Sequence, residues 1–122
     1  MKNLGRFTLL YAEDDAETRK RYAQYFNHIF DEIFIAHNGE QAKQLYHLHQ
    51  PDVLILDNYM PKLTGLDLAK DIRQTDNTTK IILLTAADDQ ATLLKAIELN
   101  LVTYLIKPVK SQQLKTTLLK LS

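Results

Sequence analysis

The sequence predicts an α/β domain in which a parallel five-stranded sheet is covered by helices on both faces. Five short apolar stretches alternate along the 122 residues with five stretches whose apolar residues recur at helical spacing. The apolar run Val53–Leu56 has no polar alternation, which is typical of a strand buried on both faces. Because the connections are short, right-handed crossovers and parallel strands are expected.

The first strand is predicted at residues 7–12, which are apolar and aromatic. Three consecutive acids, Glu13, Asp14 and Asp15, follow it. A helix comes next, with apolar residues at helical spacing as far as Ile29. One acid is expected to cap this helix, because a helix N-terminus favours negative charge. Three exceed what a cap needs, so a positive group should neutralise the others.

The second strand–helix unit is short. Residues 33–37 form the predicted strand and Asn38-Gly39 the turn. Residues 39–49 form the helix, and Pro51 prevents its continuation.

The third strand is the apolar run before Asp57, and it should lie at the centre of the sheet. Pro61 and Gly65 then break regular structure, so Asp57 is expected where a central strand meets its loop. That edge of an open parallel sheet is where ligands bind, although an aspartate can also simply cap a loop. A third helix starts at Gly65.

The last two units follow the same plan. Residues 80–85 form the fourth strand, and Asp88-Asp89 are expected to cap a helix that runs to about Leu99. Asn100 is expected to close that helix in a left-handed conformation. Residues 102–106 form the fifth strand, and Ser111 is expected to cap the last helix.

Composition excludes several classes of function. Fifteen basic residues balance fifteen acidic ones, which gives no support for a nucleic-acid-binding surface. The absence of cysteine excludes disulfides, thiolate catalysis and cysteine metal sites. No apolar run approaches the roughly 20 residues that span a bilayer, and the N-terminus does not resemble a signal peptide. We therefore expect a single cytoplasmic domain, residues 1–122, without an output domain.

Four strands end in a polar group, and these groups should converge because parallel strands end at one edge of the sheet. Glu13, Asp14 and Asp57 are hard oxygen ligands that suit Mg²⁺. Lys107 suits a phosphate oxygen, and Thr85 offers a hydroxyl donor. The pattern predicts phosphoryl transfer to Asp57 as the nucleophile, forming an aspartyl-phosphate.

The sequence resembles the receiver domain of two-component response regulators of the chemotaxis-regulator type across nearly its whole length. The matching pieces, in family order and spacing, are Leu10–Asp15 with Arg19, Asn38–Ala42, Pro51–Asp57, Met60-Pro61, Gly65, Leu84–Ala86 and Tyr104–Pro108. The resemblance implies a flavodoxin-like fold with strand order 2-1-3-4-5.

The resemblance also implies roles for individual residues. Asp57 would accept a phosphoryl group from a phosphohistidine on a sensor histidine kinase or a histidine phosphotransfer protein. Asp14, Asp57 and the Tyr59 carbonyl would bind Mg²⁺ directly, with Glu13 acting through water. Thr85, Ala86 and Lys107 would contact the phosphate, and Thr85 and Tyr104 would relay the change to the face formed by the fourth helix, fifth strand and fifth helix. The Lys107-Pro108 bond is expected to be cis.

Three other functions remain open from the sequence. A haloacid-dehalogenase-type phosphatase would need a second acid where Tyr59 stands. A flavin carrier would need a phosphate loop where the three acids stand. A degenerate receiver could act as a docking module that takes no phosphate. We therefore expect a phosphoacceptor rather than a turnover enzyme. We also expect slow loss of the phosphoryl group, because Tyr59 would crowd the attacking water and Ala87 offers no group to orient it.

The remaining expectations concern partners. The four histidines are expected to have structural or surface roles rather than to bind metal, and Tyr22 and Tyr25 to pack in or beside the core. The last helix lacks the dense charge of a symmetric dimer face, so we expect a monomer or weak dimer with an unidentified downstream effector.

Overall fold

The computed structural model describes residues 6–86 and 89–121. Its elements are β1 (Thr8–Ala12), α1 (Ala16–Asn27), β2 (Glu32–Ala36), α2 (Gly39–His49), β3 (Val53–Asp57), α3 (Gly65–Arg73), β4 (Lys80–Ala86), α4 (Gln90–Ile97), β5 (Thr103–Lys107) and α5 (Ser111–Leu119). The strands form one parallel sheet in the order β2-β1-β3-β4-β5. The flavodoxin-like arrangement expected from the sequence is therefore confirmed.

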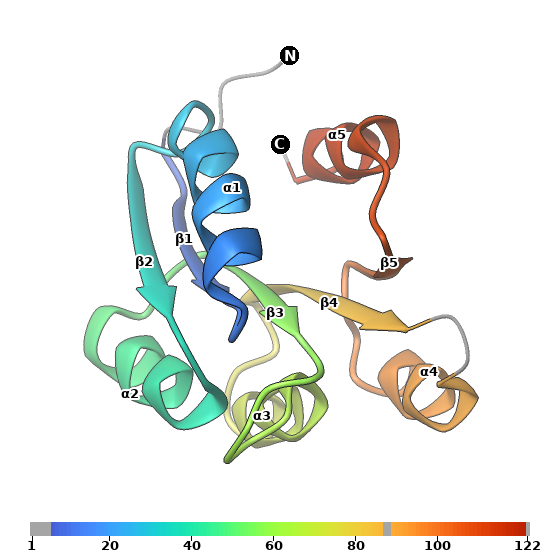
Figure 1. Ribbon diagram of the computed structural model, residues 1–122. Helices are drawn as coiled ribbons and strands as arrows, with labels where there is room; N and C mark the ends of the chain where they lie inside the picture. The colour runs from blue at the N-terminus through green and yellow to red at the C-terminus, as the bar shows by residue number, and fades with distance from the viewer. Residues whose placement is uncertain (1–5, 87–88, 122) are drawn as a thin grey trace.

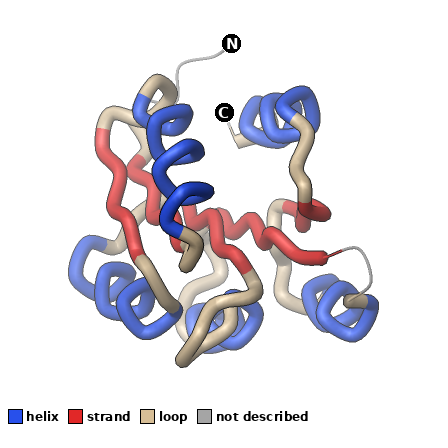
Figure 2. Tube along the Cα trace, in the orientation of Figure 1, coloured by secondary structure: helices blue, strands red, loops and turns tan. Residues whose placement is uncertain are grey.

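Helices cover both faces of the sheet, with α1 and α5 on one side and α2, α3 and α4 on the other (Figure 1; Figure 2). Successive side chains of a strand point to opposite faces. Leu10 and Leu54 therefore pack in the core beneath α2 and α3, while Leu9 and Ile55 pack in the core beneath α1 and α5. Two-sided burial is the reason that the central strands are apolar without alternation.

Four helices begin with a side-chain cap. Asp15, Asn38, Thr64 and Asp89 each accept a hydrogen bond from a backbone N–H in the first turn of α1, α2, α3 and α4. The expectation that Ser111 caps α5 was wrong. Ser111 is already the first helical residue, because the backbone of the preceding lysine is still extended and that lysine occupies the cap position without a side-chain bond. None of the helices described is long and apolar enough to cross a membrane.

Several element ends differ from the sequence prediction by one or two residues. β5 includes Lys107 as its last residue, and α4 ends at Ile97 rather than near Leu99. Asn100 has φ 53°, so the predicted left-handed residue is confirmed. The Lys107-Pro108 peptide bond is cis, also as expected. The proposed capping residue Asp88 lies outside the described residues, and its neighbour is the cap observed.

Two glycines allow the loop after β3 to pack closely. A Cβ on Gly39 would lie 1.8 Å from the carbonyl oxygen of Leu63, and one on Gly65 would lie 2.7 Å from the carbonyl oxygen of Asp57. No larger residue fits at either position without displacing backbone. These contacts place the starts of α2 and α3 directly against the loop that follows Asp57.

Candidate functional site

The candidate site lies at the carboxyl edge of the sheet. Glu13 and Asp14 follow β1, Asp57 ends β3, and Thr85 and Lys107 lie at the ends of β4 and β5. The parallel register keeps these strand ends level across the sheet. The groups are distant in sequence, and the topology alone brings them to the same edge.

Lys107 joins two buried carboxylates. Its Nζ lies 3.3 Å from Oε1 of Glu13 and 3.3 Å from Oδ2 of Asp57. Both acids are only 1% exposed. Burial lowers the pKa of Lys107, but the charges of Asp57 and Glu13 outweigh burial and leave the pKa raised. The ammonium form is therefore held in place as the positive group that the acids require.

The acids that follow β1 serve different purposes. One carboxylate oxygen from each of Glu13, Asp14 and Asp57 lies within 4.8 Å of the others. Burial raises the pKa of Glu13 and the neighbouring Asp57 raises it further, while burial and the neighbouring Glu13 raise the pKa of Asp14. Asp15 instead accepts hydrogen bonds from the backbone N–H and hydroxyl of Thr18, and these bonds lower its pKa.

The donor set fits a hard divalent cation. It offers carboxylate oxygens and no nitrogen or sulfur, which is the chemistry that Mg²⁺ prefers. Burial is the main cause of the raised pKa values of Glu13 and Asp14, and the neighbouring acids raise them further, so a cation between the carboxylates would favour their ionised forms. No histidine joins this group within residues 6–86 and 89–121. His49 stacks on Phe34, with ring centroids 3.9 Å apart, as a packing residue.

Arg19 fixes the backbone of the acidic loop. Its Nη1 donates to the carbonyl oxygens of Glu13 and Asp14, at 3.0 and 3.3 Å. The guanidinium therefore holds the loop conformation through backbone oxygens, while the neutralising charge next to the buried carboxylates comes from Lys107.

Thr85 carries a buried hydroxyl without a hydrogen-bond partner among the described residues. The residue has no exposed surface, and within the described part of the chain its hydroxyl forms no hydrogen bond of acceptable geometry. Leaving such a group unpaired costs about 1–3 kcal/mol. Ala86 follows it as the half-buried end of β4. Tyr104, on the neighbouring strand β5, is 36% exposed.

Tyr59 touches the phosphoacceptor candidate through its backbone. Its N–H donates to Oδ1 of Asp57 at 3.2 Å, while its phenol donates to Oδ2 of Asp89 at 2.5 Å. Tyr59 was expected from the sequence to offer its carbonyl to Mg²⁺ and to slow phosphoryl loss, but no sequence signal indicated its link to the cap of α4. Ala87, the other residue expected to influence phosphoryl lifetime, lies outside the described residues.

Asn58 is a further residue that the sequence analysis missed. It is buried, and its backbone N–H donates to the carbonyl of Leu84 at 2.8 Å. Its side-chain oxygen accepts from the N–H of Leu66, and its amide nitrogen donates to the hydroxyl of Thr92. Asn58 thus joins β3 to β4, α3 and α4. An asparagine after a strand looks like any loop residue, so no sequence signal marked it.

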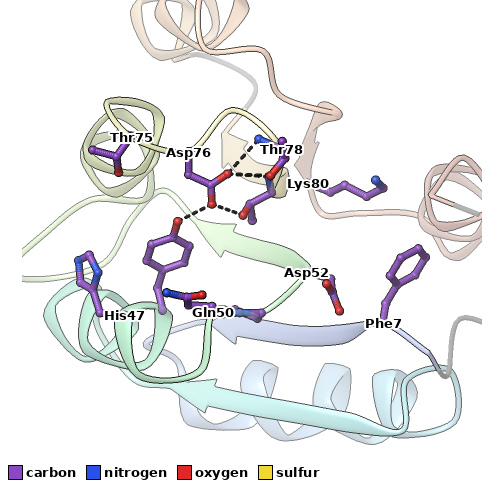
Figure 3. A pocket seen from close by; sticks show the side chains of 11 residues that line it. Phe7, His47, Gln50, Asp52, Thr75, Asp76, Thr78 and Lys80 are labelled. Atoms are coloured by element: carbon purple, nitrogen blue, oxygen red, sulfur yellow. Dashed lines mark hydrogen bonds between the residues drawn. The ribbon is translucent and has the colours of Figure 1, made fainter.

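A hollow of about 480 Å³ lies at the opposite, amino edge of the sheet (Figure 3). Its main polar group, Asp76, accepts hydrogen bonds from Tyr46, Thr78 and Thr79. Burial would raise the pKa of Asp76, but these bonds lower it well below its usual range, and the pKa of Tyr46 rises to about 12 through burial and Asp76. The carboxylate is saturated by the protein, so it fastens α2 to the α3–β4 connection.

Comparison with known proteins agrees with this architecture. The family model of the response regulator receiver domain matches residues 9–119. The chain is 34% identical over 113 residues to the transcriptional regulatory protein DpiA of Escherichia coli K12, covering 91% of this chain and 50% of DpiA. It is 36% identical over 118 residues to the probable C4-dicarboxylate response regulator DctR of Priestia megaterium, covering 95% and 52%. The chain therefore spans about half the length of these curated relatives.

Solved structures show the same relationship. The N-terminal domain of an uncharacterized protein from Wolinella succinogenes superposes with TM-score 0.86 at 33% identity, covering 93% of this chain and 92% of that one. A LuxR-family DNA-binding response regulator from Staphylococcus aureus superposes with TM-score 0.85 at 30% identity, covering 93% and 97%. The chain belongs to the receiver-domain family of two-component response regulators, which are signalling proteins rather than turnover enzymes.

Proposed function

We propose that this receiver is a phosphorylation-activated switch and that Asp57 is its phosphoacceptor. The supporting observation is the environment of the Asp57 carboxylate. One oxygen lies 3.3 Å from the amine of Lys107, the other accepts the N–H of Tyr59, and the side chain is nearly inaccessible elsewhere. These contacts fix the direction in which a carboxylate lone pair can meet an incoming phosphorus atom.

The proposed donor is a phosphohistidine of a sensor histidine kinase or a histidine phosphotransfer protein. A carboxylate oxygen of Asp57 attacks phosphorus, so a P–O bond forms as the P–N bond breaks, and the donor imidazole leaves with the electron pair. Lys107 stays protonated. Its ammonium group pairs with the carboxylate of Asp57 before the transfer and with a phosphoryl oxygen after it. The raised pKa of Lys107 supports this role, because the ammonium must persist at neutral pH.

Asp14, Asp57 and the backbone carbonyl of Tyr59 are the proposed direct ligands of Mg²⁺, with Glu13 acting through water. When bound, the ion would offset negative charge on the transferring phosphoryl group. The proximity of the three carboxylates, within 4.8 Å, supports this assignment. Arg19 contributes by holding the loop that carries two of them.

Thr85 and Tyr104 are the proposed switch residues. The unpaired hydroxyl of Thr85, together with the N–H of Ala86, would hydrogen-bond the phosphoryl oxygens, and Tyr104 would move inward behind Thr85. The face formed by α4, β5 and α5 then changes shape. Coupling between two such sites is typically about 1–3 kcal/mol, which shifts populations without refolding.

The output of the switch is also a proposal. The named relatives include a transcriptional regulator, and this chain covers about half of their length. We propose that residues 1–122 form a single receiver domain that acts in the cytoplasm as a monomer or weak dimer and binds an effector rather than nucleic acid directly. The exposed apolar side chains Leu94 and Ile97 on α4 and Ile106 on β5 support this face as the contact surface.

Treating the protein with acetyl phosphate and Mg²⁺ tests the proposal. We expect the intact mass to rise by one phosphoryl group, and Asp57→Asn should abolish the gain while leaving the amide NMR spectrum folded. No mass gain in the wild type, with the kinase domain of a sensor histidine kinase also failing as donor, would favour a docking module. Sustained phosphate release from many phosphomonoesters would favour a phosphatase.

Slow self-dephosphorylation is part of the same proposal. Tyr59 lies two residues after Asp57, and its side chain is expected to hinder the attacking water. The phosphoryl lifetime in Mg²⁺ can be followed by loss of the added mass. A half-life of seconds would contradict this expectation.

A further inference from the structure

Tyr59 joins the proposed phosphoacceptor to the start of α4, because its backbone N–H donates to Asp57 and its phenol donates to Asp89. The phenol oxygen donates to Asp89 at 2.5 Å, across the gap between the loop after β3 and the start of α4. Burial raises the pKa of this phenol, as does its bond to Asp89, whereas the hydroxyl of Thr85 and the N–H of Ala86 act to lower it. The hydrogen bond to Asp89 is the one side-chain bond that the phenol forms among the described residues, and the two donors act on it more weakly.

The acceptor of this phenol is also a structural residue of α4. Asp89 is the helix cap, and its carboxylate accepts from the N–H of Thr92 at 3.1 Å and from the Thr92 hydroxyl at 2.6 Å. Its own N–H donates to the carbonyl of Ala86 at 3.3 Å. The Thr92 hydroxyl in turn accepts from Asn58 at 3.4 Å. Of the two residues that follow Asp57, Asn58 is therefore bonded to the first turn of α4 and Tyr59 to its cap.

A phosphoryl group on Asp57 would disturb this arrangement in two ways. Its oxygens need the hydroxyl of Thr85 and the N–H of Ala86, two groups that also act on the phenol of Tyr59. It also adds negative charge near the carboxylate of Asp89. Like charges repel, and a phosphoryl oxygen competes with a carboxylate for the phenolic proton. Both effects weaken the bond between the phenol and Asp89 when Asp57 carries a phosphoryl group.

We propose that Tyr59 and Asp89 form an inhibitory latch, in which the bond between the phenol and the cap of α4 holds the start of that helix until a phosphoryl group displaces the phenol. The latch rests on the proposed function, since it acts at the same site. It is a second connection to the α4 face, separate from the one through Thr85 and Tyr104. Tyr59 is thus a positioning residue whose hydroxyl disfavours the phosphorylated state.

Beryllofluoride with Mg²⁺ is the probe for the test, and its apparent affinity is read from amide NMR shifts of the whole chain. Tyr59→Phe removes only the hydroxyl and keeps both the backbone carbonyl and the ring. Loss of one opposing hydrogen bond should tighten binding about three- to tenfold. Asp89→Asn keeps a good helix cap but weakens the acceptor and removes its charge, so it should also tighten binding. The double variant should gain less than the product of the two single effects.

Tyr25→Phe is the matched control, because it removes a half-buried phenol on α1, away from the site, and should leave the affinity unchanged. Hydrogen exchange of the first turn of α4 provides a second measurement. Wild-type protein should lose protection there when beryllofluoride binds, and Tyr59→Phe should show the lower protection already in the free state. If wild type binds beryllofluoride and Asp57→Asn does not, the phosphoacceptor assignment stands. If Tyr59→Phe then binds beryllofluoride no more tightly than wild type, the latch is wrong. Failure of wild type to respond would overturn both.

Discussion

The acidic site should destabilise the unmodified fold, and Asp57→Asn measures by how much. With carboxylate oxygens of Glu13 and Asp57 within 4.8 Å, their repulsion is about 3.5 kcal/mol or more at an effective dielectric of about 20. At the same dielectric each acid gains about 5 kcal/mol from Lys107 at 3.3 Å. Burying a carboxylate also costs several kcal/mol. Together these terms predict that Asp57→Asn raises the free energy of unfolding by about 1–3 kcal/mol at pH 7.5 without metal.

The stability of the fold should also depend on pH in a definite direction. The folded-state pKa of Glu13 is raised above its ordinary value of 4.5, so between those two values the folded state binds a proton that the unfolded state has released. Stability that this group contributes is present below pH 4.5 and is lost as the pH rises through the folded pKa. The raised pKa of Asp14 acts in the same direction. Replacing Asp57 removes one cause of the shift and should flatten the dependence.

Urea denaturation of both proteins from pH 4.5 to 8, with chelator, is the assay. We expect the two curves to approach each other at low pH and to separate at high pH. Saturating Mg²⁺ should stabilise wild type more than the variant, because a ligand stabilises the state that binds it. If Asp57→Asn is no more stable than wild type at pH 7.5 in chelator, the electrostatic account of this site is wrong.

Three other predictions concern single contacts. Gly39→Ala should lower the free energy of unfolding by about 1–3 kcal/mol in urea, because the new Cβ overlaps the Leu63 carbonyl. Asp76→Asn should lower the free energy of unfolding by about 2 kcal/mol at pH 7 in the same assay. The lowered pKa of Asp76 means that wild type keeps this stability above the usual aspartate pKa and loses it in acid, so the difference should shrink there. Thr85→Val should stabilise the unmodified protein by about 1 kcal/mol in thermal unfolding yet weaken beryllofluoride binding about tenfold, because it removes an unpaired buried donor.

The sequence contained enough to predict the order and type of all ten elements, because burial on both faces of a sheet leaves continuous apolar runs. It also predicted which groups would meet. A parallel sheet carries every strand end to one edge, so Lys107 and Asp57 were expected at the same edge, and the lysine amine lies 3.3 Å from the carboxylate there although β4 separates the two strands. Cap residues were less predictable: side-chain preference favours Ser111 as the cap of α5, yet the lysine before it occupies that position without a side-chain bond.

Side-chain partners across the fold were decided by tertiary structure. Nothing local indicates that Asn58 joins three elements, that Asp76 is saturated by Tyr46 from another helix, or that the phenol of Tyr59 meets Asp89. These contacts depend on loop conformation and on how closely helices approach the sheet, which short-range patterns do not encode. The sequence by itself determined the fold and the chemical groups at the carboxyl edge of the sheet, because apolar periodicity and the residues that end each strand can be recognised from short segments of the chain. Only the folded molecule decided how that chemistry is connected to α4, because hydrogen bonds between distant residues form after packing sets their separation.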